Sequence, residues 1–363
     1  MKKTILLVVA ILLCSMKMMA EGLTATLQQG ETMTAFYGVN AFVDAYNAAE
    51  DGAVITLSEG QFNRVEYIKK SITVVGNMAF DGTGYEKTFL YTTYIQADNV
   101  TFEGINFTGD IYLMGINNCH IKRCKVDNYL YGYYNTTHTN TVVDQCVINL
   151  EYSIQYSKNY CIKNSTINYF GNCNPSTNIA YISNCYICYF SQSRNSSYYQ
   201  PYAIYKNCVL GMDNAGYTSS YTTYLYSPSE FYNNYFYRTT TSSSYTNYYL
   251  SHQFSNGCLY NGNTSSGDKS VYSRNTYTGN YIISSFNQIG DDGTPVGITG
   301  GSGFSPYPSI PRVTSKQIDS RTDSQGKLNV KITVSTEETL VKEKTETSEE
   351  EGNGETAGET PTE

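Results

Sequence analysis

Carboxylates and amines recur at one position of a short sequence repeat, a pattern that could support acid–base chemistry. Glu103, Lys122, Asp144 and Lys163 each stand second in a six-residue unit. If successive units stack as neighbouring coils, the two carboxylates lie ~10 Å apart with an ammonium between them. A polysaccharide lyase or a glycoside hydrolase needs acids and a base arranged at such distances. Glu103, Lys122 and Asp144 are therefore candidate catalytic residues.

The same row can also be interpreted as an outward ladder of charges, in which each opposite-charge neighbour contributes about 0.2 to 1 kcal/mol. Calcium-dependent lyases need clustered Asp ligands, and hydrolases need paired carboxylates. Acids are sparse between residues 100 and 285, where they are Glu103, Asp110, Asp127, Asp144, Glu151, Asp213, Glu230 and Asp268. This scarcity favours the charge ladder over a catalytic site.

The three histidines, His120, His138 and His252, lie far apart and lack the spacing of zinc ligands. Solvated or packed histidine is the simpler interpretation. The sequence therefore predicts no metal site and no cofactor.

Tyrosine is the most abundant residue able to recognise a ligand, with 37 Tyr and no Trp in the chain. An aromatic ring with a hydroxyl rim can stack on a sugar face or contact a protein surface. Tyrosine also suits strands and stacks on its neighbour in the next coil, which is the structural alternative. The candidate ligand-binding residues are Tyr129, Tyr131, Tyr133, Tyr152 and Tyr156.

The distribution of charge gives no support for a nucleic-acid partner. The chain carries −8, and residues 336–363 hold ten Glu and two Lys, so the tail accounts for all of it. The body is near neutral, with no basic stripe for nucleic acid and no polybasic membrane patch. We expect no nucleic-acid partner, and the oligomeric state stays open.

The N-terminus has the pattern of an export signal. Lys2 and Lys3 precede an apolar run from Ile5 to Cys14, and the segment closes at Ala20. A run this short does not span a bilayer, which needs about 20 residues, and no second apolar span follows. We expect residues 1–20 to be a signal peptide and the protein to be secreted or at the cell surface; lipidation at Cys14 is a weaker alternative.

A six-residue unit recurs beyond residue 98, with apolar residues at its first and last positions. Its period is near twenty residues, which is typical of a solenoid. Clear copies are Phe102–Phe107, Ile121–Val126, Val143–Ile148, Ile162–Ile167 and Ile182–Ile187; looser copies are Tyr205–Leu210, Tyr232–Tyr237, Ser255–Tyr260 and Tyr272–Tyr277.

Each unit must contain a bend, because its first and fourth residues cannot share one face of a strand whose side chains alternate with period two. The third position supplies a residue that tolerates a left-handed backbone, with Arg123, Gln145 and Arg274 as exceptions. We therefore expect positive φ at Asn164, Asn184, Asn207 and Asn234. Stacked coils of this kind form a parallel β-helix.

Five of the ten cysteines fall at the fourth position of the unit. Cys124, Cys146, Cys185, Cys208 and Cys258 are expected to be inward-facing, aligned and unpaired, because buried free Cys behaves as a small hydrophobe. Cys119, Cys161, Cys173 and Cys188 lie elsewhere, and their pairing stays open.

The N-terminal region begins with apolar residues at helical spacing from Val39 to Ala49, for which Asn40 is a candidate N-cap. Strand patterns with glycine turns follow over 53–62 and 68–77. This order resembles the N-terminal cap of pectin-lyase-like right-handed β-helices. That family includes pectate lyases, polygalacturonases and adhesins, so the resemblance implies a fold and no single function.

The C-terminal region contains Asp291–Gly301, Pro308–Val313 and an alternating stretch, Gly326–Ser335. Together they resemble the closing module of secreted β-helix proteins of Gram-negative gut bacteria. The predicted organisation is a signal peptide at 1–20, a β-helix with its cap at 21–288, a closing β module at 289–335 and an acidic disordered tail at 336–363.

The sequence thus predicts an all-β protein, a right-handed parallel β-helix solenoid with an N-terminal capping helix and a small C-terminal β module. Its predicted function is non-catalytic binding of a polysaccharide, a surface glycan or another surface through lateral faces rich in Tyr and Asn. The alternative is a polysaccharide lyase or glycoside hydrolase acting on acidic plant or host glycans.

Overall fold

The structure is a computed structural model of the whole chain. It describes residues 22–80, 86–151, 156–171, 180–187, 203–211, 230–237, 259–261, 272–274, 281–283, 289–307, 309, 312–318, 321, 325, 327 and 330–335. The chain divides into two units, Met1–Pro306 and Tyr307–Glu363. The predicted signal peptide and acidic tail lie outside the described residues.

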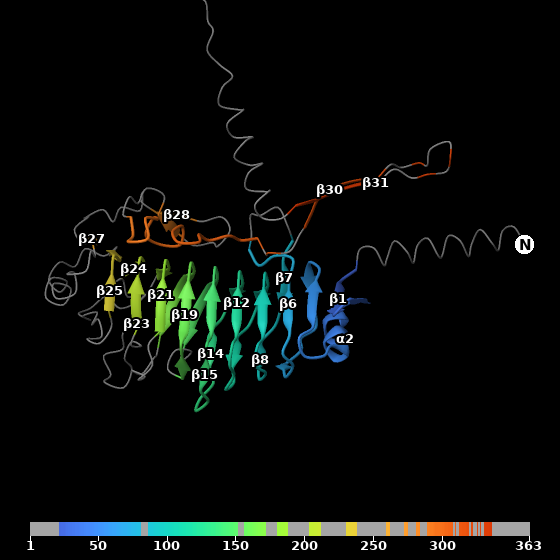
Figure 1. Cartoon of the computed structure of the whole chain (residues 1–363), viewed down its shortest axis with the longest axis horizontal. Helices are drawn as coiled ribbons and strands as arrows, with labels where there is room; N and C mark the ends of the chain where they lie inside the picture. The colour runs from blue at the N-terminus through green and yellow to red at the C-terminus, as the bar shows by residue number, and fades with distance from the viewer. Residues whose placement is uncertain are drawn as a thin grey trace, which may run out of the picture. The chain divides into compact units, whose positions relative to one another are not determined.

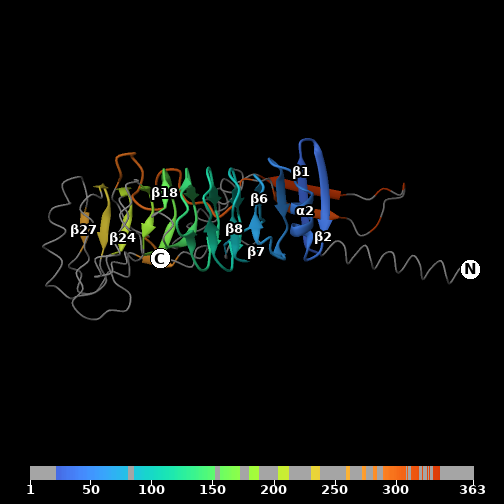
Figure 2. The same cartoon turned by 90° about the horizontal axis from the view of Figure 1, so that it is seen from below.

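The first unit is a parallel β-solenoid, whose short strands stand side by side along its length (Figure 1, Figure 2). One sheet has eleven strands in the order β2-β1-β3-β6-β9-β12-β16-β19-β21-β23-β25. The first three strands pair antiparallel and the others parallel. Their bounds are Thr24–Gln29 (β1), Thr32–Tyr37 (β2), Val54–Leu57 (β3), Thr73–Val75 (β6), Thr101–Glu103 (β9), His120–Lys122 (β12), Val142–Asp144 (β16), Tyr160–Lys163 (β19), Ala180–Ser183 (β21), Ala203–Lys206 (β23) and Glu230–Tyr232 (β25).

A second, branched sheet forms the other sides of the coils. One path is Gly60–Gln61 (β4), Thr88–Leu90 (β7), Asn106–Phe107 (β10), Lys125–Val126 (β13), Val147–Glu151 (β17), Thr166–Gly171 (β20), Tyr186–Ile187 (β22), Val209–Gly211 (β24), Tyr235–Tyr237 (β26) and Leu259–Asn261 (β27). The other path, which joins β17, is Tyr67–Ile68 (β5), Thr93–Ile95 (β8), Ile111–Leu113 (β11) and Leu130–Gly132 (β14). A separate two-stranded sheet pairs His138–Thr139 (β15) with Ser157–Lys158 (β18).

The first position of the repeat unit fills the core. Parallel pairing places Phe102 opposite Ile121, and the same register continues from coil to coil through Tyr205 and Phe231. Seven residues form this inward row, and all are buried: Phe102, Ile121, Val143, Ile162, Ile182, Tyr205 and Phe231. The predicted register of the units is confirmed through Tyr205; in the next coil the inward residue is Phe231, one residue before the predicted Tyr232.

The left-handed bend is confirmed at the third position of the unit. Asn164, Asn184 and Asn207 have φ of 45°, 50° and 54°. Arg123 and Gln145, which sequence reasoning treated as exceptions, also have positive φ, at 51° and 55°. The geometry of the coil therefore imposes this backbone even where the residue type does not favour it.

The prediction for Asn234 is wrong by one residue. Asn233 has the positive φ, at 51°, because Phe231, and not Tyr232, lies opposite Tyr205 and fills the inward position. Asn234 is instead buried at the fourth position, where its Oδ1 accepts a hydrogen bond from the N–H of Cys208 at 2.8 Å.

The fourth position forms a buried ladder of small polarisable side chains. Cys124, Cys146, Cys185 and Cys208 are free and buried, as predicted. The Sγ of Cys146 donates to the carbonyl of Ile121 in the preceding coil and accepts the N–H of Cys124 at 3.4 Å. Cys119 and Cys161 are also free, whereas Cys173, Cys188 and Cys258 lie outside the described residues.

A second left-handed corner precedes the strands of the eleven-stranded sheet and was not predicted. It is built by asparagines three residues before each of the first four units: Asn99, Asn118, Asn140 and Asn159, with φ of 56°, 58°, 53° and 53°. Their exposed side chains are linked between coils, since Asn118 Nδ2 donates to Asn99 Oδ1 and Asn159 Nδ2 donates to Asn140 Oδ1, both at 3.0 Å.

A helix, α2 (Ala41–Ala48), forms where helical spacing predicted one, and it packs against β1, β2 and β3. Asn40 is its N-cap residue, but its side chain makes no capping hydrogen bond; its Oδ1 accepts Asn63 Nδ2 instead. The C-terminal carbonyls of the helix are satisfied by Lys70, whose Nζ donates to the carbonyls of Tyr46 and Ala49 at 2.8 Å. A cation at the C-terminal end of a helix also interacts favourably with the helix dipole.

Residues 289–306, here called the strap, run along the corner formed by the third position of the unit (orange in Figure 1). Asn207 Nδ2 donates to Asp291 Oδ1, Asn164 Nδ2 donates to the carbonyls of Ile298 and Gly300, and Gln145 Oε1 accepts the N–H of Ser305. The strap therefore passes the coils in reverse order, from later to earlier. Its apolar residues pack on the solenoid, and Phe304 contacts Phe80 edge-on.

The last predicted unit, 272–277, does not continue the parallel sheets. Tyr272–Arg274 (β28) pairs antiparallel with Tyr281–Ile283 (β29).

In the second part of the chain, Tyr307–Glu363, Arg312–Ile318 (β30) pairs antiparallel with Val330–Ser335 (β31), where an alternating strand was predicted. The boundaries proposed for a closing module at 289–335 stay a prediction.

Candidate functional site

The charged side chains of the candidate catalytic row lie on consecutive strands of the eleven-stranded sheet. Glu103, Lys122, Asp144 and Lys163 stand opposite one another on β9, β12, β16 and β19. They point away from the core, because the residues before them in each strand fill the inward row. The predicted position of these groups on adjacent coils is therefore correct.

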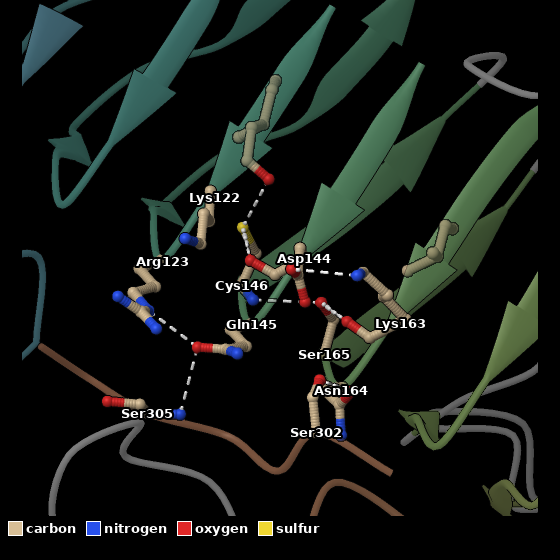
Figure 3. A network of polar contacts seen from close by, with 12 residues as sticks. Lys122, Arg123, Asp144, Gln145, Cys146, Lys163, Asn164, Ser165, Ser302 and Ser305 are labelled. Atoms are coloured by element: carbon tan, nitrogen blue, oxygen red, sulfur yellow. Dashed lines mark hydrogen bonds and ion pairs between the residues drawn. The ribbon is translucent and has the colours of Figure 1, made fainter. Parts of the chain in front are cut away.

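Both carboxylates are held in ion pairs with cations of the next coil. Glu103 Oε1 lies 3.7 Å from Lys122 Nζ and 3.3 Å from Arg123 Nη1. Asp144 Oδ2 lies 3.3 Å from Lys163 Nζ (Figure 3). This is the arrangement expected of a charge ladder, in which each ionised group offsets the charge of its neighbour.

Arg123 extends the ladder toward the strap. It is only 7% exposed, and its Nε donates to Gln145 Oε1 at 2.7 Å. The same Gln145 oxygen accepts the backbone N–H of Ser305, so it lies between the arginine and the strap (Figure 3). A buried guanidinium needs such partners, since an unpaired buried charge is strongly destabilising.

The described histidines have separate surroundings. His120 lies at the edge of the charge ladder, where burial and the nearby Lys163 lower the pKa of its imidazole. His138 is buried, and its Nδ1 lies 3.1 Å from Thr141 Oγ1. His252 falls outside the described residues. Within the described part of the chain, no group of three or more His, Cys, Asp or Glu is arranged to hold a metal ion.

Three of the predicted ligand-binding tyrosines gather on the outer side of β14. Tyr131 stacks on Tyr112 with ring centroids 5.0 Å apart, Tyr129 packs on Tyr131 at 5.4 Å, and Tyr133 meets Tyr112 edge-on at 6.3 Å. Tyr156 instead contacts Tyr134 edge-on at 6.0 Å. Tyr152 lies outside the described residues.

Tyr131 is the last ring of a row that sequence reasoning missed in part. Tyr67, Tyr94, Tyr112 and Tyr131 occupy the same position on β5, β8, β11 and β14. Their ring centroids are 5.1, 4.6 and 5.0 Å apart, and all three contacts are stacked. We call this row and the outer surface around it the tyrosine face. The sequence pattern that could have identified this row is a Tyr between two inward-facing residues, as in Thr93–Ile95, Ile111–Leu113 and Leu130–Gly132.

The stack determines which atoms a ligand can reach. The faces of the inner rings are covered by their neighbours, so a ligand can contact these rings only at their edges and hydroxyl groups. Tyr67 is 40% exposed and Tyr133 42% exposed, whereas Tyr94, Tyr112 and Tyr131 are half-buried. The tyrosine face thus carries a phenol group at each coil; a phenol hydroxyl can donate one hydrogen bond and accept others, and that of Tyr112 donates to Asp110.

Comparison of the chain with protein-family models, with curated proteins and with solved structures finds no match. Among the described residues, no helix combines the length and apolarity needed to cross a membrane.

Proposed function

We propose that this chain is a secreted or cell-surface β-solenoid that binds an extended glycan through its tyrosine face without cleaving it. The observation that supports it best is the regular stack of Tyr67, Tyr94, Tyr112 and Tyr131 on four consecutive coils. Exposed aromatic residues that carry a hydroxyl are common in recognition surfaces.

The repetition of the stack favours a polymer over a compact ligand. Equivalent hydroxyls recur at each coil, at the ring spacing of about 5 Å. A ligand that repeats on a similar length can make the same contact several times, and such contacts add through effective concentration. A polysaccharide has this repetition and carries hydroxyls along its whole length.

Rigidity also supports binding. The rings are fixed by stacking on one another, and the strands that carry them are hydrogen-bonded in parallel register. A ligand would therefore order few additional side chains when it binds, and less conformational entropy is lost.

The charge ladder gives less support to the alternative of a lyase or hydrolase. A catalytic acid or base must reach the bond that it breaks, whereas Glu103 and Asp144 are directed to the cations of neighbouring coils. These ion pairs stabilise the sheet in the way expected of a charge ladder.

The test is a glycan-binding screen of the full chain with product detection in the same wells. We expect binding without new reducing ends or unsaturated products. Replacing Tyr94, Tyr112 and Tyr131 with Phe keeps the ring stack and removes three hydroxyls, and it should weaken binding about tenfold or more. Tyr181→Phe, at an exposed tyrosine of the other sheet, is the matched control. Released products would establish the enzyme alternative, and absence of binding to every polymer would overturn the proposal.

A further inference from the structure

The tyrosine face has a composition that points to the kind of glycan. Three rows of outward side chains run along β5, β8, β11 and β14, with the stacked tyrosines in the middle. On one side lie Thr92, Asp110 and Tyr129; on the other lie Lys69, Gln96, Met114 and Tyr133. Contacts link neighbouring coils in both outer rows, since the N–H of Asp110 donates to Thr92 Oγ1 and Gln96 Nε2 lies 3.5 Å from Met114 Sδ.

Within the three rows, the charged side chains are Lys69 and Asp110. Lys69 stands at the first coil, where its Nζ lies over the ring of Tyr67, near the exposed pair Arg64–Glu66. Asp110 stands in the middle, and the remaining side chains of the three rows are uncharged. The outer surface of the eleven-stranded sheet differs, because it carries the alternating charge ladder of Glu103, Lys122, Asp144 and Lys163 and a further cation at Lys206.

Asp110 is built into the face. Its Oδ1 accepts the N–H of Tyr129 at 3.0 Å, and its Oδ2 accepts the hydroxyl of Tyr112 at 3.4 Å. An anionic group placed against Tyr112 would therefore meet a fixed carboxylate of the same sign. Opposed like charges are unfavourable, and at a partly buried site water screens them less than at an open surface.

The phenols are suited to neutral hydroxyl groups. Burial, and then Asp110, raise the pKa of Tyr112 to about 12, and burial raises that of Tyr94. Both hydroxyls thus stay protonated at physiological pH; that of Tyr94 can donate as well as accept, whereas that of Tyr112, whose proton is donated to Asp110, is left to accept. A sugar hydroxyl satisfies both roles, whereas a carboxylate or sulfate oxygen only accepts.

We propose that the tyrosine face selects neutral polysaccharides, such as extended hexose or pentose polymers, and discriminates against polyuronates and sulfated glycans. This inference rests on the proposed function, whose ligand class it narrows. The side chains on which it depends are the uncharged rows and the central carboxylate of Asp110.

The experiment compares the affinity of the full chain for soluble β-1,4-linked glucan or mannan oligosaccharides with that for oligogalacturonate, at low and high salt. We expect the neutral oligosaccharides to bind about tenfold or more tightly, with the difference decreasing as salt screens the carboxylate. Asp110→Asn retains the side-chain oxygen that accepts the N–H of Tyr129 and should reduce the difference in affinity between the neutral oligosaccharides and oligogalacturonate. Asp127→Asn removes a charge beside Lys125 on another strand path and should leave this difference unchanged.

The outcomes separate the two proposals. Preferential binding of oligogalacturonate, or a preference for neutral ligands that Asp110→Asn leaves unchanged, would overturn the selection inferred here while leaving glycan binding intact. Failure of the wild-type chain to bind either class would overturn glycan binding itself. Melting temperatures of both variants show whether a lost signal reflects unfolding.

Discussion

Asn164 Nδ2 donates a hydrogen bond to the carbonyl of Ile298 at 3.2 Å, so a corner of the solenoid holds a segment 134 residues later in the chain. The same Asn164 side chain also contacts Gly300 and accepts the hydroxyl of Ser302. Asparagine at this corner thus has two roles: it tolerates the left-handed backbone, and its amide anchors the strap.

A substitution of Asn164 by glycine tests these two roles separately. Asn164→Gly keeps the left-handed backbone accessible but removes the buried amide, leaving strap carbonyls without a donor. We expect a loss of about 1 to 3 kcal/mol in the free energy of unfolding, measured by urea denaturation. Asn159→Gly, at the exposed second corner, is the matched control and should cost less, because water can replace its side-chain bonds. Equal losses in the two variants would show that the strap contacts contribute little.

Glu103 provides a test of the charge ladder. Glu103→Gln removes the carboxylate beside Arg123, which is 7% exposed, and should lower the free energy of unfolding by about 3 to 5 kcal/mol. Glu66→Gln breaks the exposed pair with Arg64 and should change it by about 0 to 1 kcal/mol. A catalytic Glu103 would give the opposite result, a lost activity with little change in stability.

The sequence was sufficient to predict the solenoid because its signal is local and repeated. An apolar residue, a left-handed residue and a small residue recur within six positions, and each copy supports the register of the next. The register predicted from the sequence was wrong at Phe231–Tyr235. Phe231 and Tyr232 are both aromatic, and two asparagines follow them, so either aromatic residue could be the inward one. Either choice fits the local pattern there, and only packing against Tyr205 decides between them.

The strap and the tyrosine row were harder to predict for different reasons. Contacts such as Asn207–Asp291 join residues far apart in the chain, and a glycine-rich segment carries no periodicity that would indicate its partner. Tyr94 and Tyr112 are single residues within ordinary strands, so they were less conspicuous than the run at Tyr129–Tyr134. Their alignment depends on coil lengths that the second corner helps to set, and that corner was not recognised.

The cysteine ladder predicts a distinct order of thiol reactivity. Burial raises the pKa of Cys124 to about 12 and that of Cys146 well above its usual value, so reactive thiolate is scarce in the folded protein. In native protein we expect Cys161, which is half-buried, to be alkylated first among the described cysteines. Cys124, Cys146, Cys185 and Cys208 should react only after unfolding, without reductant, as followed by mass spectrometry of labelled peptides. A disulfide linking any two of these four would contradict the ladder.

Tyr112 gives a prediction for alkaline pH. Its folded-state pKa of about 12 lies above the value near 10 of an unfolded tyrosine, so folding favours the neutral phenol. The stability that this provides is fully present below pH 10 and is lost as pH rises toward 12, because the unfolded chain then releases a proton that the folded chain retains.

The ultraviolet phenolate titration of wild type minus that of Tyr112→Phe should have its midpoint near 12. In urea-unfolded protein the same difference should fall near 10. In Asp110→Asn the folded midpoint should decrease, because the carboxylate is the second cause of the shift after burial. A midpoint near 10 in protein that circular dichroism shows to be folded would mean that Tyr112 is more exposed than its place in the stack implies.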